Sequence, residues 1–319
     1  MSEFDLIRDH FARVGAARSD VTLGVGDDCA LLRVPPDAEL AVSIDTLVAG
    51  VHFFRDCDPE ALGHKCLAVG LSDLAAMGAE PAWATLAVTL PDDDPSWLTA
   101  FGRGFAVLAS AHKVQLVGGD TTRGPLTVTV QVHGFVPGGE AARRSGARPG
   151  DLIHVSGTLG DAGLALRLLQ DGKPVSGFLR GRLERPTPRV AQGLELRRLA
   201  SAMIDISDGL AADLGHILET SGVGAEIELA SLPLSADVSE RVAAGADWGL
   251  PMSSGDDYEL CFTVPPDRLA DLESVADRLE VGLSCIGCVT DGDGLRCLLP
   301  NGTTWEPERS GYDHFSDAG

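Results

Sequence analysis

The strongest constraint on the fold is a pattern that recurs in both halves of the chain: an apolar strand runs into an aspartate-bearing turn, and a helix follows. In "AMIDISDGLAADLGHILETS" an apolar run reaches Asp205, Asp208 stands before a glycine, and an amphipathic helical pattern begins. Strands and helices that alternate in this way predict mixed layers, so we expect an α/β fold.

The length of 319 residues favours two domains over a single core. The segment "PGGEAARRSGARPGD", Pro137 to Asp151, is rich in glycine, proline and charge, which is typical of a connection. We therefore predict an N-terminal domain over residues 1–148 and a C-terminal domain over residues 149–319.

Hydrophobic periodicity predicts the main elements of each half. In the first half we expect a capped helix from Ser2 to Val14, strands at 39–48, 83–90 and 126–136, helices at 59–78 and 95–112, and a strand "VQLV" ending in a glycine turn "GGDTTRG". In the second half we expect strands at 151–157, 202–207, 257–264 and around the CxxC segment, and helices after "GTLGDAG", after Pro188, at 209–221 and near 267–279.

Composition excludes several classes of partner. The formal net charge of −22, from 47 acidic and 25 basic residues, repels phosphate backbones and anionic headgroups, so we expect neither a nucleic-acid nor a membrane partner. No signal-peptide pattern and no apolar run of about 18 residues occurs, which indicates a cytoplasmic protein. Seven scattered cysteines indicate reduced thiols, and the lone pair Cys285 and Cys288 predicts a buried strand rather than a zinc site.

Aspartates at strand ends, in glycine turns or on apolar stripes are the candidates for chemistry. A buried carboxylate stays charged only when it is paired, hydrogen-bonded or bound to a metal, and oxygen ligands suit Mg²⁺ or Ca²⁺. Magnesium in turn suggests phosphate substrates, because divalent ions offset the repulsion between an acidic site and a polyphosphate. The acids selected in this way are Asp27, Asp28, Asp45, Asp73, Asp120, Asp205 and Asp208.

Each of these acids also has a structural explanation. In "GVGDDCALL" we expect Asp27 and Asp28 to lie beside the core, where Asp27 could serve a turn, and Asp208 could cap the following helix. Asp120 could stabilise its glycine turn. Asp73 falls on an apolar helical stripe, so it is either a functional acid or half of a buried ion pair with Lys65 or an arginine.

Common nucleotide-binding signatures are absent from the sequence. It contains neither GxxxxGK[ST] nor the kinase HRD and DFG motifs, so an ATP-using protein would be of another type. The glycine-rich segments "VGGDTTRG" and "SGTLGDAG" are weak phosphate-binding signals. Arg143 and Arg144 could hold a phosphate or lie solvated on the surface.

The order of the motifs is more specific than any one of them. The series "GDDCA", "SIDTLVAGVHF", "LSDLAAMGAEP", "VGGDTTRG", "RRSGARPGD", "DISDGLAADLGHI", "GDDYELCFT" and "GYDHF" resembles the thiamine-monophosphate kinase family, within the aminoimidazole ribonucleotide synthetase-like superfamily. The resemblance covers nearly the whole chain. It implies a two-domain synthetase-like fold, a homodimer paired through the N-terminal domains, and ATP-dependent phosphorylation of thiamine monophosphate to thiamine diphosphate.

The resemblance also implies roles for individual residues. Those matching magnesium positions are Asp28, Ser43, the backbone of Ile44, Asp45, Asp73, Asp120, Asp205 and Asp208, for several Mg²⁺ ions. Those matching ATP positions are Gly119, Asp120, Arg144 and Ser207, and those matching substrate positions are His52, Asp256 and Tyr312. Asp27 is expected to orient its loop or to hold a metal-bound water. The sequence departs from the family in reading "GDDYEL" for "GEDYEL" and in placing Tyr312 where tryptophan is frequent.

The expected chemistry is consistent with this set of residues. The acceptor is a phosphate monoester, and with a second pKa of about 6 it is largely ionised at neutral pH, so direct in-line transfer needs no general base. Without the resemblance, His52 would be interpreted as a core histidine and Tyr312 as a packing aromatic. Two alternatives stay open: another ATP-dependent synthetase-like enzyme, which "GDDYEL" and "GYDHF" disfavour, and a non-catalytic protein that binds divalent cations.

Overall fold

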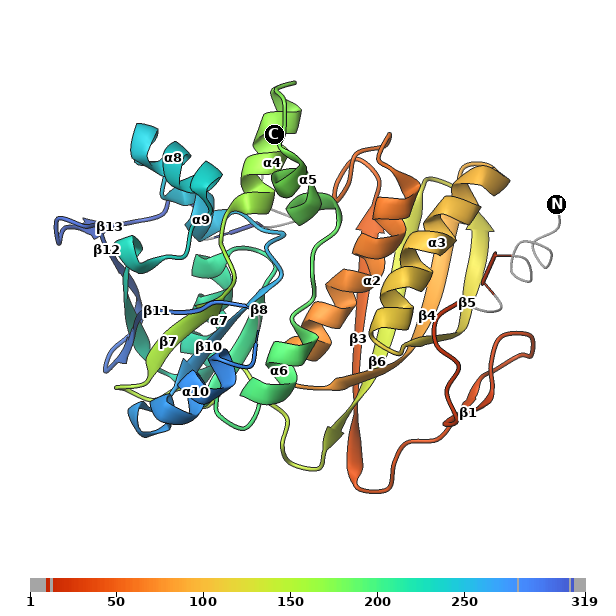
Figure 1. Ribbon diagram of the computed structural model, residues 1–319, viewed down its shortest axis with the longest axis horizontal. Helices are drawn as coiled ribbons and strands as arrows, with labels where there is room; N and C mark the ends of the chain where they lie inside the picture. The colour runs from red at the N-terminus through yellow and green to blue at the C-terminus, as the bar shows by residue number, and fades with distance from the viewer. Residues whose placement is uncertain (1–9, 12–13, 280, 310, 313–319) are drawn as a thin grey trace. The chain divides into compact units, whose positions relative to one another are not determined.

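The computed structural model describes residues 10–11, 14–279, 281–309 and 311–312. The chain divides into unit 1, comprising residues 1–74, 79–140 and 184–188, and unit 2, comprising residues 75–78, 141–183 and 189–319. Each unit has its own sheet and helices (Figure 1), which makes the protein a two-domain mixture of helices and strands as predicted. The boundary between residues 148 and 149 stays a prediction.

Unit 1 is built on a four-stranded sheet in the order β3-β6-β4-β5. Its elements are β3 (Ala38–Val48), α2 (Pro59–Ala76), β4 (Glu80–Leu90), α3 (Pro95–Ala111), β5 (Gln115–Arg123) and β6 (Thr127–Pro137), with β1 (Val21–Leu23) and β2 (Leu31–Leu32) forming a separate ribbon. The pairs β3–β6 and β4–β6 are antiparallel, and β4–β5 is parallel. The predicted helix near the N-terminus falls largely outside the described residues.

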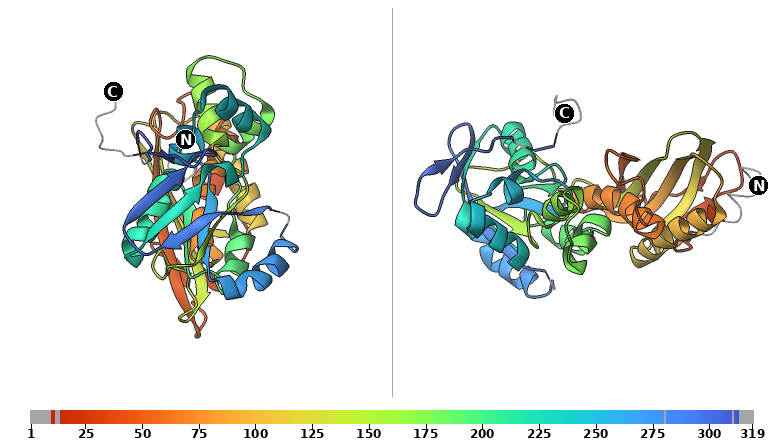
Figure 2. Two further views of the ribbon diagram at one scale, coloured as in Figure 1. Left: turned by 90° about the vertical axis from the view of Figure 1, so that its left-hand side faces the viewer. Right: turned by 90° about the horizontal axis from the view of Figure 1, so that it is seen from above.

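Helices α2 and α3 cover one face of the unit 1 sheet, as Figures 1 and 2 both show. Proline in the first turn suits each helix, and at α3 the side chain of Asp94 accepts N–H groups from Ser96 and Trp97. On the opposite face the side chains of Leu40, Val42 and Ile44 are exposed. We call this second surface the open face. Along β3, residues on the open face alternate with residues that face the helices.

Unit 2 contains a seven-stranded sheet in the order β13-β12-β9-β11-β7-β10-β8. Its strands are β7 (Leu152–Ser156), β8 (Ala202–Ile206), β9 (Gly224–Glu228), β10 (Glu259–Val264), β11 (Leu283–Thr290), β12 (Gly294–Leu298) and β13 (Thr304–Trp305). Its helices are α4 (Asp161–Gln170), α5 (Gly177–Glu184), α6 (Val190–Leu196), α7 (Leu210–Ser221), α8 (Ala236–Gly245), α9 (Gly249–Ser253) and α10 (Leu269–Ala276). Only β9 and β12 pair in parallel among these strands as described.

The core of unit 2 forms where α7 packs against the sheet. Leu210, Leu214 and Ile217 of the helix meet buried strand residues such as Ile204 and Ile227 in one cluster. Burial of several large aliphatic side chains at about 1.5–3 kcal/mol each fixes the helix on the sheet. The start of α7, where the predicted acids lie, is therefore firmly held. No helix of the described segments is long and apolar enough to span a membrane.

Candidate active site

An aspartate pair lies between β3 and α2 in unit 1. Ser43 and Asp45 are on the helix-facing side of β3, and the Oγ of Ser43 donates a hydrogen bond to Oδ2 of Asp73 on α2. Burial, and secondarily the negative charge of Asp73, raises the pKa of Asp45 from 3.8 to about 7. The structure thus brings together three of the predicted magnesium positions.

The chemistry of this pair fits a hard cation. Oδ2 of Asp45 is buried and has no hydrogen-bond partner in the part of the chain that the structure describes. An unpartnered buried carboxylate oxygen is costly, and a cation would satisfy it. One hydroxyl and two carboxylates are the oxygen donors that Mg²⁺ prefers. The Ile44 side chain is 62% exposed on the open face, so only the backbone of Ile44 could join the set.

The loop that carries Asp27 and Asp28 corrects one expectation. Both residues are exposed, so the prediction that they lie beside the core is wrong. The neighbouring apolar run is only partly buried: Ala30 and Leu32 pack against a core cluster, whereas Leu31 between them is 55% exposed. Oδ1 of Asp27 accepts the N–H of Asp28 at 2.8 Å, which shapes the loop.

The segment around Gly119 and Asp120 corrects a second expectation. The predicted turn "GGDTT" is continuous strand, because β5 pairs with β4 from Gln115 to Arg123. A Cβ at Gly119 would lie 1.9 Å from the carbonyl oxygen of Leu86, so only glycine fits at this exposed backbone. Asp120 is exposed and lies beside Ala87 in register, which places it on the open face.

Asp28 and Asp120 do not join the aspartate pair. Among the described residues, no three His, Cys, Asp or Glu side chains gather in a way that could hold a metal ion. Unit 1 therefore presents its predicted metal positions as one close pair, Asp45 with Asp73, and two separate exposed acids.

His52 lies in a turn that follows the end of β3 at Val48. The Nδ1 atom of its ring accepts a hydrogen bond from the backbone N–H of Val48 at 3.0 Å. The backbone N–H of His52 donates to the carbonyl of Val48, also at 3.0 Å. An accepting Nδ1 leaves the proton of the neutral imidazole on Nε2. The half-buried ring is thereby oriented with a donor on its other side.

In unit 2 the predicted positions Asp205, Ser207 and Asp208 lie at the junction of β8 and α7. Asp205 is 4% exposed on β8, and Ser207 and Asp208 form the turn before the helix. Asp208 is not the N-cap of α7, because the N-cap residue is Gly209. Instead, Oδ2 of Asp213 accepts the N–H groups of the turn.

The two predicted substrate positions of unit 2 are attached to this same turn. The N–H of Asp256 donates to the carbonyl of Ser207 at 2.9 Å, and the N–H of Tyr312 donates to the carbonyl of Asp208 at 3.0 Å. Asp256 has a φ of 69°, a left-handed conformation that is uncommon for residues other than glycine. Its Oδ1 accepts the hydroxyl of Tyr258 at 2.9 Å. The structure therefore assembles four predicted positions of unit 2 around one turn.

Arg144 lies on the exposed connection that leads into β7. The loop is fixed at both sides, because Arg143 accepts the N–H of Met203 and the hydroxyl of Ser221 accepts the N–H groups of Gly146 and Ala147. The guanidinium of Arg144 is left at the surface of a held loop. This is consistent with a phosphate contact as much as with a solvated side chain.

Sequence reasoning missed three buried acids behind the unit 2 turn: Asp213, Asp257 and Glu259. Burial and the nearby Asp208 raise the pKa of Asp213 to about 7, against the lowering effect of its backbone donors. Burial likewise raises the pKa of Asp257, which accepts the N–H of Gly160. Asp213 falls on the apolar stripe of α7, so the criterion that selected Asp73 would also have selected Asp213.

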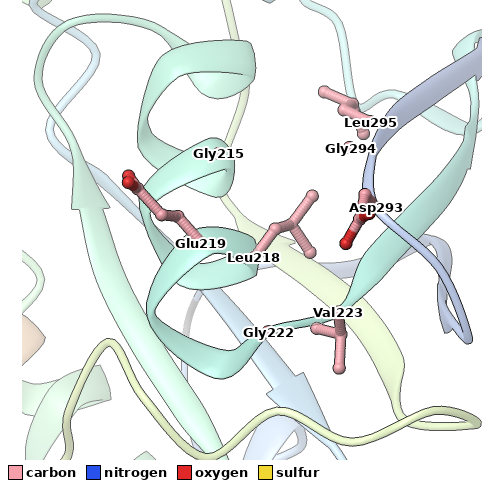
Figure 3. Close-up of a pocket in the computed structure, with 8 residues that line it drawn as sticks. All are labelled: Gly215, Leu218, Glu219, Gly222, Val223, Asp293, Gly294 and Leu295. Atoms are coloured by element: carbon pink, nitrogen blue, oxygen red, sulfur yellow. The ribbon is translucent and has the colours of Figure 1, made fainter.

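A pocket of about 350 Å³ lies between the end of α7 and the start of β12 (Figure 3). In the figure Leu218 points from the helix toward the strand, whereas Glu219 points away from it. The lining contains no predicted site residue and no lysine or arginine. We therefore do not assign this pocket to a nucleotide.

The chain is similar to known proteins in both of its units. The chain matches the family model "AIR synthase related protein, N-terminal domain" over residues 26–136 and "AIR synthase related protein, C-terminal domain" over residues 148–299. A curated thiamine-monophosphate kinase of Escherichia coli (strain K12) is 50% identical over 320 residues, which cover 98% of each chain.

Two solved structures are similar over almost the whole chain. Thiamine-monophosphate kinase from Stenotrophomonas maltophilia K279a has a TM-score of 0.85 and 47% identity, and the match covers 92% of this chain and 94% of that chain. A structure described as AaThiL complexed with AMPPCP and TMP has a TM-score of 0.77 and 32% identity. The match covers 98% of this chain and 96% of that chain.

Proposed function

The chain belongs to the AIR synthase related family and, within it, to the thiamine-monophosphate kinases, and on this basis we propose that it transfers the terminal phosphoryl group of ATP to thiamine monophosphate. The observation that carries the proposal is identity of 50% across 98% of both chains. The similar structure described with AMPPCP and TMP supports the same pair of substrates.

We propose that Mg²⁺ binds at Ser43, Asp45 and Asp73. The unpartnered oxygen of Asp45 and its elevated pKa support a cation there. The other magnesium positions implied by the resemblance are Asp28, the backbone of Ile44, Asp120, Asp205 and Asp208. When bound, Mg²⁺ would offset the repulsion between two phosphate groups.

For ATP we propose contacts from Gly119, Asp120, Arg144 and Ser207. The bare backbone of Gly119 supports this role, because an approaching phosphate meets no side chain at that position. For thiamine monophosphate we propose His52, Asp256 and Tyr312. The Nε2 donor of His52 and the half-exposed ring of Tyr312 support contacts with a polar group and an aromatic ring, respectively.

We propose direct in-line transfer without a phosphoenzyme. The accepting phosphate is already an anion at neutral pH, so its oxygen needs no general base to attack. Positioning and neutralisation of charge are then the main tasks of the protein. The abundance of aspartates around the two candidate sites supports this division of labour.

We propose that two copies pair through the open face of unit 1. The exposed side chains on this face form an apolar row of Leu40, Val42 and Ile44. Such a row supports contact with the same face of a second copy. The substitution Val42→Glu should shift light-scattering mass from dimer to monomer, while Val107→Glu on the exposed side of α3 should not. A wild-type monomer would refute the pairing. The cytoplasmic location expected from the sequence stays a prediction.

The function is tested by incubating the protein with Mg·ATP and thiamine monophosphate and measuring thiamine diphosphate and ADP. We expect both products in equal amounts, and none of the diphosphate from free thiamine. Folded protein that makes no diphosphate would refute the proposal. Tight Ca²⁺ uptake without Mg·ATP binding would instead support a cation-binding protein.

A further inference from the structure

Asp213 occupies an unusual position for an aspartate inside an amphipathic helix. It lies in the first turns of α7, is 3% exposed, and uses a single oxygen, Oδ2, to accept three backbone N–H groups. The donors are Ser207 at 3.0 Å, Asp208 at 3.1 Å and Gly209 at 3.1 Å. These N–H groups precede or begin the helix, where no intrahelical acceptor is available for them.

The turn that Asp213 holds is also the support for two other chain segments. Its carbonyl groups at Ile206, Ser207 and Asp208 accept N–H groups from Tyr258, Asp256 and Tyr312, at 2.8, 2.9 and 3.0 Å. One side of the turn therefore bonds to a helix carboxylate, and the other side bonds to the segments that carry the proposed thiamine contacts.

These segments approach the turn at glycines that leave no spare room. A Cβ at Gly255 would lie 2.4 Å from the carbonyl oxygen of Ser207, and a Cβ at Gly311 would lie 2.7 Å from that of Asp208. Because backbone touches backbone, a displacement of the turn is transmitted to Asp256 and Tyr312 instead of being absorbed by flexible side chains.

We propose that Asp213 is a positioning residue. It fixes the place of the proposed ATP and metal positions, Ser207 and Asp208, relative to the proposed substrate positions, Asp256 and Tyr312. This inference rests on the proposed function. Asp213 acts only through the backbone of the turn, and it touches neither substrate.

Three substitutions separate geometry from charge. Asp213→Asn keeps an oxygen of the same reach but loses the charge, Asp213→Glu keeps the charge but lengthens the side chain, and Asp213→Ala removes the acceptor. If geometry decides, Asp213→Asn stays within about tenfold of wild-type kcat/KM, whereas Asp213→Ala and Asp213→Glu fall by about 10²-fold, the cost of a misplacement of about 1 Å. Exposed Glu219→Gln on the same helix is the matched control and should be unaffected.

The decisive readout is the KM for each substrate, measured well below the thermal midpoint of each variant. A misplaced turn should raise the KM for Mg·ATP and the KM for thiamine monophosphate together. In Asp213→Asn both KM values should return toward those of wild type. Folded Asp213→Ala with wild-type kinetics, or Asp213→Asn as impaired as Asp213→Ala, would overturn the inference. If Asp213→Ala does not fold, the other two variants test the inference. Asp213→Asn should then be clearly more active than Asp213→Glu, and equal impairment of the two would overturn the inference.

Calorimetric binding of Mg²⁺ with AMPPCP distinguishes failure of this inference from failure of the proposed function. An inactive wild type refutes the function. Affinity for Mg·AMPPCP that falls about tenfold or more in Asp213→Ala and is restored in Asp213→Asn would still support the positioning role. Equal affinity in all three variants would contradict it.

Discussion

Both units bury carboxylates, but the neighbours of those carboxylates differ. In unit 1 the pKa of Asp45 is raised by burial and by a second carboxylate, Asp73. In unit 2 the fully buried Glu259 accepts hydrogen bonds from Arg182 at 2.9 Å, from Arg189 at 2.6 Å and from the hydroxyl of Ser156 at 2.6 Å.

The comparison separates two uses of buried charge. A carboxylate between two guanidinium groups has its charge balanced within the protein, which is typical of a structural site. A buried carboxylate beside another carboxylate has no counter-charge in the protein, so where backbone donors are also lacking it needs a proton or a cation from solution. The neighbours of a buried acid therefore indicate its role better than its burial does.

The largest effect is expected at the aspartate pair. Asp73→Asn removes a proposed magnesium ligand and also relieves the repulsion with Asp45. We expect thiamine diphosphate formation to fall by about 10³-fold, since metal assistance contributes several kcal/mol, while the thermal midpoint stays equal or rises. Exposed Asp37→Asn is the control. Activity and stability that fall together in Asp73→Asn would make the pair structural.

Glu259→Ala should show the opposite pattern. It leaves Arg182 and Arg189, whose side chains are only 11% and 13% exposed, without their shared carboxylate. We expect a loss of about 3–5 kcal/mol in the free energy of unfolding, measured by urea denaturation. A loss below about 1 kcal/mol would remove the distinction between the two kinds of site.

The pH dependence of stability should report the unbalanced charge of the aspartate pair. In the folded state the pKa of Asp45 is about 7 against 3.8 as the ordinary value, so the folded protein holds the proton more tightly. Its contribution to stability is full below the ordinary value and is lost as the pH rises through about 7. In EDTA the thermal midpoint should fall between pH 5 and 8 more steeply for wild type than for Asp45→Asn, and Mg²⁺ should reduce the difference. Identical slopes would contradict this assignment.

The smallest effect is expected where an ion pair is exposed. Arg278 and Glu195 meet at 2.8 Å with side chains 58% and 47% exposed. Solvent screens such a pair, so Arg278→Ala should change the free energy of unfolding by no more than about 1 kcal/mol. A loss as large as that of Glu259→Ala would show that burial does not control the strength of these pairs.

Local patterns in the sequence predicted much of this arrangement. The alternating pattern of residues 39–48 predicts that Ser43 and Asp45 share one face of β3, and the apolar stripe of α2 marked Asp73 as exceptional. Most of the long elements were also predicted, because their periodicity extends over many residues. Two strands of unit 2, β9 and β12, were not assigned, although β7 and β8 of the same length, five residues, were predicted.

The misses arose where distant neighbours override local signals. The glycines of "GGDTT" suggested a turn, but β4 pairs with them as a strand. Asp27 and Asp28 stand before an apolar run in which Ala30 and Leu32 pack against a core cluster, but the two acids themselves lie in an exposed loop. The partners of Glu259 are 70 and 77 residues away in sequence, so no local pattern could identify them.

The cation site of unit 1 can be tested by calorimetric titration of the nucleotide-free protein with Mg²⁺ at pH 8, for wild type and for Asp73→Asn. If the unshared carboxylates of unit 1 form a cation site, wild type binds Mg²⁺ and Asp73→Asn loses that binding while its thermal midpoint is maintained. Equal Mg²⁺ affinity and stoichiometry in the two proteins would contradict the account.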